Sequence, residues 1–183
     1  MTAGEILGPG QGKVITLPGV TAVFKAVADR RPGDFVVLEL TAEPGFAGPR
    51  PHLHHRHEEL FYVLEGQFDF FVDGDVRRVG PGSFVTVPPG VMHDFRNPGT
   101  EPARWLGIAS PAGLDRYVEE VLALVAAGTF SEEELRRLRL RYDTEEPDDV
   151  PPGHWSEQRQ PNIGEATGVS DTVNDLVARS PDS

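Results

Sequence analysis

Residues 51–59 read PHLHHRHEE, and this stretch holds four of the six histidines of the 183-residue chain. His52 and His54 are two positions apart, and successive side chains of a β-strand point to opposite faces. On a strand, both imidazoles would therefore lie on one face and close to each other. Two imidazoles held in this way are a candidate pair of metal ligands.

A carboxylate and a further imidazole extend this pair. Glu59 shares a predicted strand face with Phe61 and Val63, and a bare carboxylate in such an apolar environment is costly. A divalent cation would offset that cost. His93 lies on a later predicted strand, and folding it back beside the pair completes a site of three histidines and one glutamate. Such a site leaves two positions of an octahedron open, which is typical of catalytic rather than structural metal sites.

Short apolar runs punctuated by glycine and proline surround these residues and indicate an all-β fold. The runs predicted to be strands are 13–17, 20–27, 35–42, 58–64, 67–72, 75–79, 83–87, 94–96 and 104–109. Asp73-Gly74, between two of these runs, is a strong hairpin signal. Residues 1–110 are therefore predicted to form one β-sandwich or barrel.

Beyond the predicted barrel the pattern changes, first to helical spacing and then to polar sequence. Ser110-Pro111 is predicted to cap a helix that Gly128 ends. Residues 111–142 are expected to form a helical appendage that packs on the barrel. Residues 143–183 are polar, acidic and proline-containing, and we expect a largely disordered tail.

The second helix of the appendage is predicted from a capping box formed by Ser131 and Glu134. Leu135 and Leu138 follow at helical spacing and are expected to face inward. The arginines of this helix are expected to be largely solvated, and they are residues 136, 137, 139 and 141.

Composition excludes several classes of function. The chain has no cysteine, which excludes disulfides, thiolate metal sites, iron–sulfur clusters and a cysteine nucleophile. Any metal must be held by histidine, carboxylate or water. The formal net charge of −12 argues against nucleic acid and anionic lipid as partners. No apolar run approaches the roughly 20 residues of a membrane span, and no signal peptide is recognised, so we expect a cytoplasmic protein without a membrane partner.

Two spaced motifs in this sequence resemble those of the cupin superfamily. The ligand spacing and the terminal glycine of the first motif, G(X)5HXH(X)3–4E(X)6G, are present from His52 through Glu59 to Gly66. The second motif, G(X)5PXG(X)2H(X)3N, matches at every fixed position from Gly82 through His93 to Asn97. The resemblance covers roughly residues 14–110. The run from His52 to Gly66 is especially similar to that of the single-domain quercetin-dioxygenase-like cupins.

The first motif departs from the pattern at its leading glycine, where Phe46 stands between Gly45 and Gly48. Its variable spacing also leaves two candidate carboxylates. Four residues between His54 and the glutamate make Glu59 the ligand, whereas three would make Glu58 the ligand. Glu59 is preferred because six residues separate it from the closing glycine, as the motif requires.

This resemblance implies a double-stranded β-helix (jelly-roll) barrel with one divalent transition metal per chain. It implies His52, His54, Glu59 and His93 as ligands of Fe, Mn, Ni, Co, Cu or Zn, with Glu59 also acting as the base. The expected activity is that of a metal-dependent dioxygenase on a small aromatic or enolisable, flavonol-like molecule. The alternatives are a non-oxidative isomerase, cyclase or decarboxylase, and a non-catalytic small-molecule-binding protein of a biosynthetic pathway. Resemblance also implies a homodimer.

Several other side chains near the motifs are candidates for substrate contact. The predicted set is Phe61, Phe70, Met92, Phe95 and Arg56. His55 and His57 are expected at the surface or in support of the ligands rather than on the metal.

Overall fold

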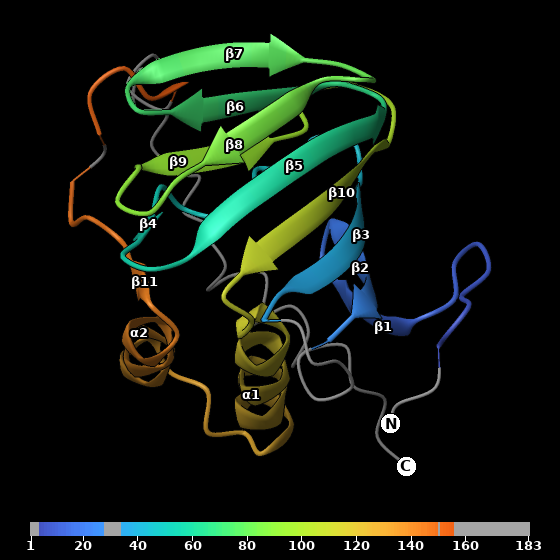
Figure 1. Cartoon of the computed structure of the whole chain (residues 1–183). Helices are drawn as coiled ribbons and strands as arrows, with labels where there is room; N and C mark the ends of the chain where they lie inside the picture. The colour runs from blue at the N-terminus through green and yellow to red at the C-terminus, as the bar shows by residue number, and fades with distance from the viewer. Residues whose placement is uncertain (1–3, 28–33, 150, 156–183) are drawn as a thin grey trace.

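The computed structural model describes residues 4–27, 34–149 and 151–155. Strands form a six-stranded sheet in the order β1-β2-β3-β10-β5-β8, a three-stranded sheet in the order β7-β6-β9, and a small sheet of β11 and β4. The strands are β1 (Lys13–Leu17), β2 (Val20–Ala26), β3 (Val36–Ala42), β4 (Leu53–His54), β5 (Glu58–Glu65), β6 (Phe68–Val72), β7 (Asp75–Val79), β8 (Phe84–Val87), β9 (His93–Arg96), β10 (Ala103–Ser110) and β11 (Thr144–Glu145). Figure 1 shows the two larger sheets facing each other, with helices α1 (Leu114–Ala126) and α2 (Glu132–Arg141) at one end. This is the jelly-roll arrangement that the family resemblance implies.

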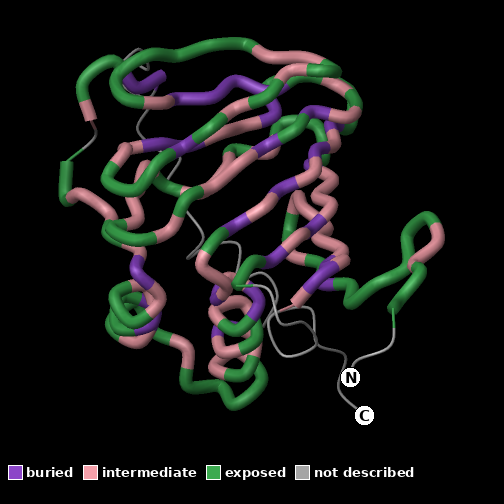
Figure 2. Tube along the Cα trace, viewed as in Figure 1, coloured by how far each residue is buried: buried purple, intermediate pink, exposed green. Residues whose placement is uncertain are grey.

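The core lies between the two larger sheets because their strands alternate inward apolar residues with outward residues. Along β10, for example, Ala103, Trp105 and Ala109 are buried, and the alternation is visible in Figure 2. The Trp105 ring meets Phe68 edge to face, with centroids 4.4 Å apart, and Phe95 with centroids 4.6 Å apart. Aromatic packing of this kind closes the interior of the barrel.

The two helices pack against each other and against the barrel end. Leu135 and Leu138 are buried beside Val121 of α1, as the spacing predicts. The Ser131 hydroxyl accepts the N–H of Glu134 at 3.2 Å, which confirms the cap of α2. No helix in the described part of the chain is long and apolar enough to cross a membrane.

The predicted cap of the first helix is wrong. Helix α1 begins after Gly113, and no side chain caps it. Ser110 instead ends β10, and its hydroxyl donates to the backbone oxygen of Asp34 at 2.9 Å. The strand therefore continues into the residue that the sequence pattern assigned to the helix.

The expectation of a disordered tail from residue 143 is also wrong for residues 143–149 and 151–155. Strand β11 pairs with β4, and Asp143, His154 and Trp155 are buried. The polar side chains of this segment find partners on the barrel, which compensates for their burial. The rest of the predicted tail, 156–183, lies outside the described residues.

Candidate metal centre

Three strands and the residue before one of them bring the predicted ligands together. His54 lies on β4, Glu59 on β5 and His93 on β9, and His52 precedes β4. One potential ligand atom from each of the four side chains lies within 4.8 Å of all the others. The backbones of His52 and His93 exchange two hydrogen bonds, at 3.0 and 2.9 Å, which hold these two residues opposite each other. Glu58 is exposed, so the carboxylate in the cluster is that of Glu59.

A backbone carbonyl fixes the orientation of each imidazole in the cluster. The Nδ1 atoms lie near the carbonyl oxygens of Arg50 for His52 (2.8 Å), Asp143 for His54 (3.1 Å) and Val91 for His93 (3.1 Å). Because a carbonyl oxygen only accepts, each neutral ring carries its hydrogen on Nδ1. Each Nε2 atom then presents a lone pair, which is the form of histidine that binds a metal.

The Glu59 carboxylate lies among these lone pairs. Its Oε2 is 2.9 Å from Nε2 of His93 and 3.7 Å from Nε2 of His54, and only 13% of its side chain is exposed. Burial would raise the pKa of Glu59, but the two histidines outweigh it and hold the pKa well below its usual range. The carboxylate is therefore ionised.

The histidine pKa values follow from the same crowding. Burial, together with the positive charge that His93 and His54 can carry, lowers the pKa of His52 to about 3. Burial also acts to lower the pKa of His54, but the Glu59 carboxylate outweighs it and raises that pKa. Without a cation, a proton is therefore favoured on His54, beside the ionised Glu59 carboxylate. A divalent transition-metal ion would replace that proton, and the set of three nitrogens and one oxygen fits such an ion.

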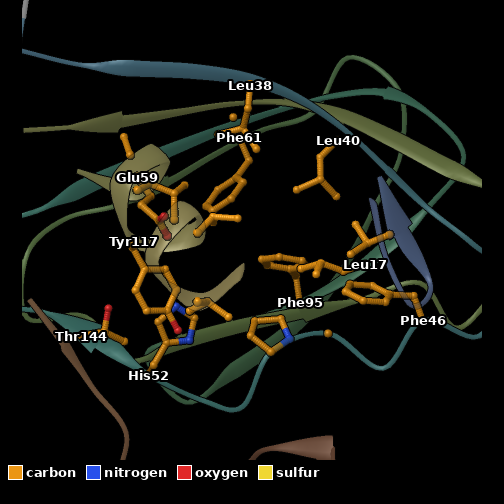
Figure 3. Close-up of a pocket in the computed structure, with 18 of the residues that line it drawn as sticks. Leu17, Leu38, Leu40, Phe46, His52, Glu59, Phe61, Phe95, Tyr117 and Thr144 are labelled. Carbon is orange, nitrogen blue, oxygen red and sulfur yellow. The ribbon is translucent and has the colours of Figure 1, made fainter. Parts of the chain in front are cut away.

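A cavity of about 510 Å³ opens beside the cluster, between the barrel and the two helices. Of the four candidate ligands, His52, His54 and Glu59 lie on its wall, whereas His93 is fully buried behind them. Most of the remaining wall is apolar, and Figure 3 shows side chains from both sheets around it. The apolar wall includes Leu17, Leu38, Leu40, Phe46, Phe61 and Phe95 from the barrel, and Leu114, Val118, Val121 and Leu122 from α1. The size and lining suit an organic molecule of drug-like dimensions.

The structure places two of the five predicted substrate residues on this wall, Phe61 and Phe95. Phe70 lies behind them, 2% exposed, with its ring centroid 5.2 Å from Phe61 and 5.7 Å from Phe95. Met92 and Arg56 also lie outside the lining. The Arg56 side chain is 74% exposed and faces Asp143. Phe70 differs from the prediction because strand alternation fixes a face but not the depth of a side chain within the barrel. Met92 and Arg56 lie outside the strands, where no strand period applies.

The segment 143–146 holds residues 50–57, the histidine-rich loop, in place. Sequence patterns did not predict this. The Asp143 carboxylate accepts the backbone N–H groups of Arg56 at 2.7 Å and His57 at 3.1 Å, while its carbonyl orients His54. Nδ1 of His57 lies 2.9 Å from the same carboxylate oxygen. Burial would raise the pKa of Asp143, but these donors outweigh burial and lower it.

The two glutamates of segment 143–146 extend this hold. Glu145 contacts His55 at 2.8 Å, and Glu146 lies 3.7 Å from the Arg50 guanidinium. The only sequence signal is a run of acidic residues directly after a helix, across the chain from a run of histidines and arginines. His55 and His57 thus contact this segment, and neither is among the four clustered ligands.

The helices contribute polar groups to the cavity that sequence analysis missed. Arg139 and Tyr117 line it, together with Glu146. The prediction that Arg139 is solvated is wrong, since only 11% of its side chain is exposed and its guanidinium lies 2.9 Å from Glu146. Arg139 is four residues after Leu135 and therefore shares the inward face of α2.

The comparison with protein families agrees with this geometry, since residues 38–109 match the family model described as cupin domain. Residues 38–109 form a cupin domain. Quercetin 2,3-dioxygenase of Bacillus subtilis is 31% identical to the chain over 93 residues, which are 50% of this chain and 27% of the relative. The chain thus spans about a quarter of the length of that relative.

Solved structures also resemble this chain. KdgF from a Halomonas species has a TM-score of 0.54 at 23% identity, with 62% of this chain and 99% of that one covered. The polyketide cyclase RemF from Streptomyces resistomycificus has a TM-score of 0.50 at 26% identity, with 59% of this chain and 80% of that one covered. The first of these supports the fold alone.

Proposed function

We propose that this protein is a metal-dependent enzyme that acts on an enolisable aromatic molecule. The observation that carries the proposal is the convergence of three Nε2 lone pairs and one buried carboxylate at the wall of an apolar cavity of about 510 Å³. The cluster supplies a site for a Lewis acid, and the cavity supplies space for a substrate with several rings.

When bound, a divalent cation lowers the pKa of an enol or phenol that reaches it. Glu59 is ionised and lies on the cavity wall, so its carboxylate is placed to accept the enol proton. Phe61 and Phe95 present rings to the aromatic body of the substrate and exclude water from the reacting end.

For the reaction itself, we propose dioxygenation, in which both atoms of one O₂ enter the product as the ring is cleaved. The similarity to quercetin 2,3-dioxygenase supports this choice. A second candidate is a cyclisation or isomerisation through the same enolate without an oxidant. The similarity to the cyclase RemF supports this alternative.

Metal analysis of the purified protein comes first, with about one transition-metal ion per chain as the expected result. Oxygen uptake is then measured with 3-hydroxyflavone, and product analysis distinguishes ring cleavage from isomerisation. Uptake of one O₂ per substrate supports dioxygenation, whereas turnover without uptake supports the second candidate.

Two variants test the residue assignment. Glu59→Gln keeps the shape of the side chain but removes the charged ligand and base, and we expect at least a hundredfold loss of kcat. His55→Gln is the control, because this histidine is exposed and lies outside the cluster. Failure to bind a transition metal after reconstitution, or full activity of Glu59→Gln, would contradict the proposal.

A further inference from the structure

Tyr117 is a polar group on the cavity wall that the proposed chemistry leaves unused. It extends from α1 into the cavity that Glu59 and His52 also line, as Figure 3 shows. Its ring packs against that of Tyr142, with centroids 5.8 Å apart. The hydroxyl therefore meets a bound molecule at the end of the cavity where the metal cluster lies.

Arg139 is the charged neighbour of the Tyr117 hydroxyl on the cavity wall. A guanidinium can only donate, so Arg139, which lies beside the Tyr117 hydroxyl and acts to lower its pKa, cannot accept its hydrogen. The O–H hydrogen is then directed to another partner. No side chain or backbone oxygen in the described part of the chain accepts it. Burial raises the pKa of Tyr117, which keeps the phenol protonated and therefore a donor.

Arg139 is linked through Glu146 to the residues beside the metal cluster. Its guanidinium pairs with Glu146, which also lies 3.7 Å from Arg50. The carbonyl of Arg50 orients the His52 ring. Two charged contacts thus link Arg139, the neighbour of Tyr117, to the residue whose carbonyl orients a candidate ligand.

We propose that Tyr117 donates a hydrogen bond to a second oxygen of the substrate, one that does not bind the metal. This inference rests on the proposed function and narrows its substrate class to aromatic hydroxy-carbonyl compounds. The hydroxyl oxygen of such a compound reaches the metal cluster, and the carbonyl oxygen accepts from Tyr117. A site built around a buried donor discriminates against analogues that leave the donor unpaired.

The test compares two naphthols, of which only one carries an acetyl group and thus a second oxygen. 1-Hydroxy-2-acetonaphthone carries a hydroxyl and a neighbouring carbonyl, whereas 1-naphthol carries the hydroxyl alone. Dissociation constants are measured by calorimetry on zinc-loaded protein, because zinc has no redox chemistry and keeps the probes intact. The variant is Tyr117→Phe. The matched control is Tyr142→Phe, whose lost hydroxyl is already committed to Glu120.

We expect Tyr117→Phe to raise the dissociation constant of the hydroxy-ketone about tenfold, which corresponds to one lost hydrogen bond. The dissociation constant of 1-naphthol should change by no more than about twofold. Tyr142→Phe should leave both probes within about twofold. An unchanged affinity ratio in Tyr117→Phe overturns the inference while the proposed function stands, since both oxygens then bind the metal. An equal effect of the two variants also overturns it. If neither probe binds the wild-type protein, both the inference and the proposed function fail.

Discussion

Removal of the Asp143 carboxylate should destabilise the protein and weaken metal binding at the candidate site, although Asp143 is not one of the four candidate ligands. This residue lies directly after α2 with φ of 66° and is 8% exposed. One of its carboxylate oxygens contacts three donors, namely the N–H groups of Arg56 and His57 and Nδ1 of His57. Asp143→Gly removes these contacts without strain at the positive φ, and Asp143→Asn keeps a neutral acceptor in the same place.

The expected loss of unfolding free energy follows from the three hydrogen bonds. A hydrogen bond to a charged acceptor contributes about 1.5 kcal/mol net, so three of them amount to about 4 to 5 kcal/mol. Glycine at a positive φ relieves strain but gains unfolded-state entropy, and these effects roughly cancel at about 1 kcal/mol each. We therefore expect a loss of about 4 kcal/mol for Asp143→Gly. For Asp143→Asn we expect about 2 kcal/mol, because neutral hydrogen bonds are roughly half as strong.

Urea unfolding of the metal-free variants measures these losses as shifts of the midpoint at unchanged slope. The pKa of Asp143 is lowered in the folded protein from its ordinary 3.8, so its stabilisation is fully present above that pH. It is lost as the pH falls through this value towards the lower folded pKa. The difference in stability between wild type and Asp143→Gly should therefore be constant from pH 7 to 5 and should shrink below about pH 4.

Zinc affinity, measured by competition with a chelator, should fall about tenfold in Asp143→Gly. The backbone carbonyl of residue 143 orients the His54 ring, and the variant removes the side-chain contacts that hold this carbonyl in place. Glu145→Gln is the control, since its partner His55 is exposed and a contact of this kind contributes less than about 1 kcal/mol. Asp143 does not have this stabilising role if both of its variants unfold at the midpoint of this control, or if the difference in stability from wild type is the same at pH 3.5 and pH 7.

Two further predictions concern the packing of the barrel. A Cβ on Gly48, whose φ is 83°, would lie 1.6 Å from the Phe95 carbonyl oxygen, so Gly48→Ala should cost more than about 3 kcal/mol in urea unfolding. Gly45→Ala has a similar φ but free space around its Cβ and should cost only about 1 kcal/mol; equal losses would contradict the steric argument. Trp155→Ala removes a buried ring that lies 4.6 Å from the Arg96 guanidinium and should lower stability by about 3 kcal/mol in a thermal melt. An unchanged melting temperature would mean that this residue does not pack on the barrel in solution.

Local sequence was sufficient for most of the fold. Alternating apolar residues and turn glycines placed nine strands close to their observed positions, because the period of a strand fixes which side chains face the core. Strands β4 and β11 were missed because each has only two residues, which is too short to show a period.

The metal cluster was equally accessible from sequence. His52 and His54 are local neighbours on one strand face, and the buried position of Glu59 among apolar residues already required a compensating charge. Motif spacing then selected His93 from the more distant sequence, and the structure brings it within reach of the other three.

The surroundings of that cluster were decided only by tertiary structure. Asp143 lies 89 residues beyond His54, and no local pattern distinguishes an acidic residue that orients a histidine from one in solvent. Arg139 is one of four arginines on α2, and only the position of Glu146 makes its burial favourable. The sequence by itself thus determined which side chains can bind the metal, because that depends on strand period and local spacing. The fold decided which groups hold them and which face the substrate, because burial of a charge depends on partners that are distant in the chain.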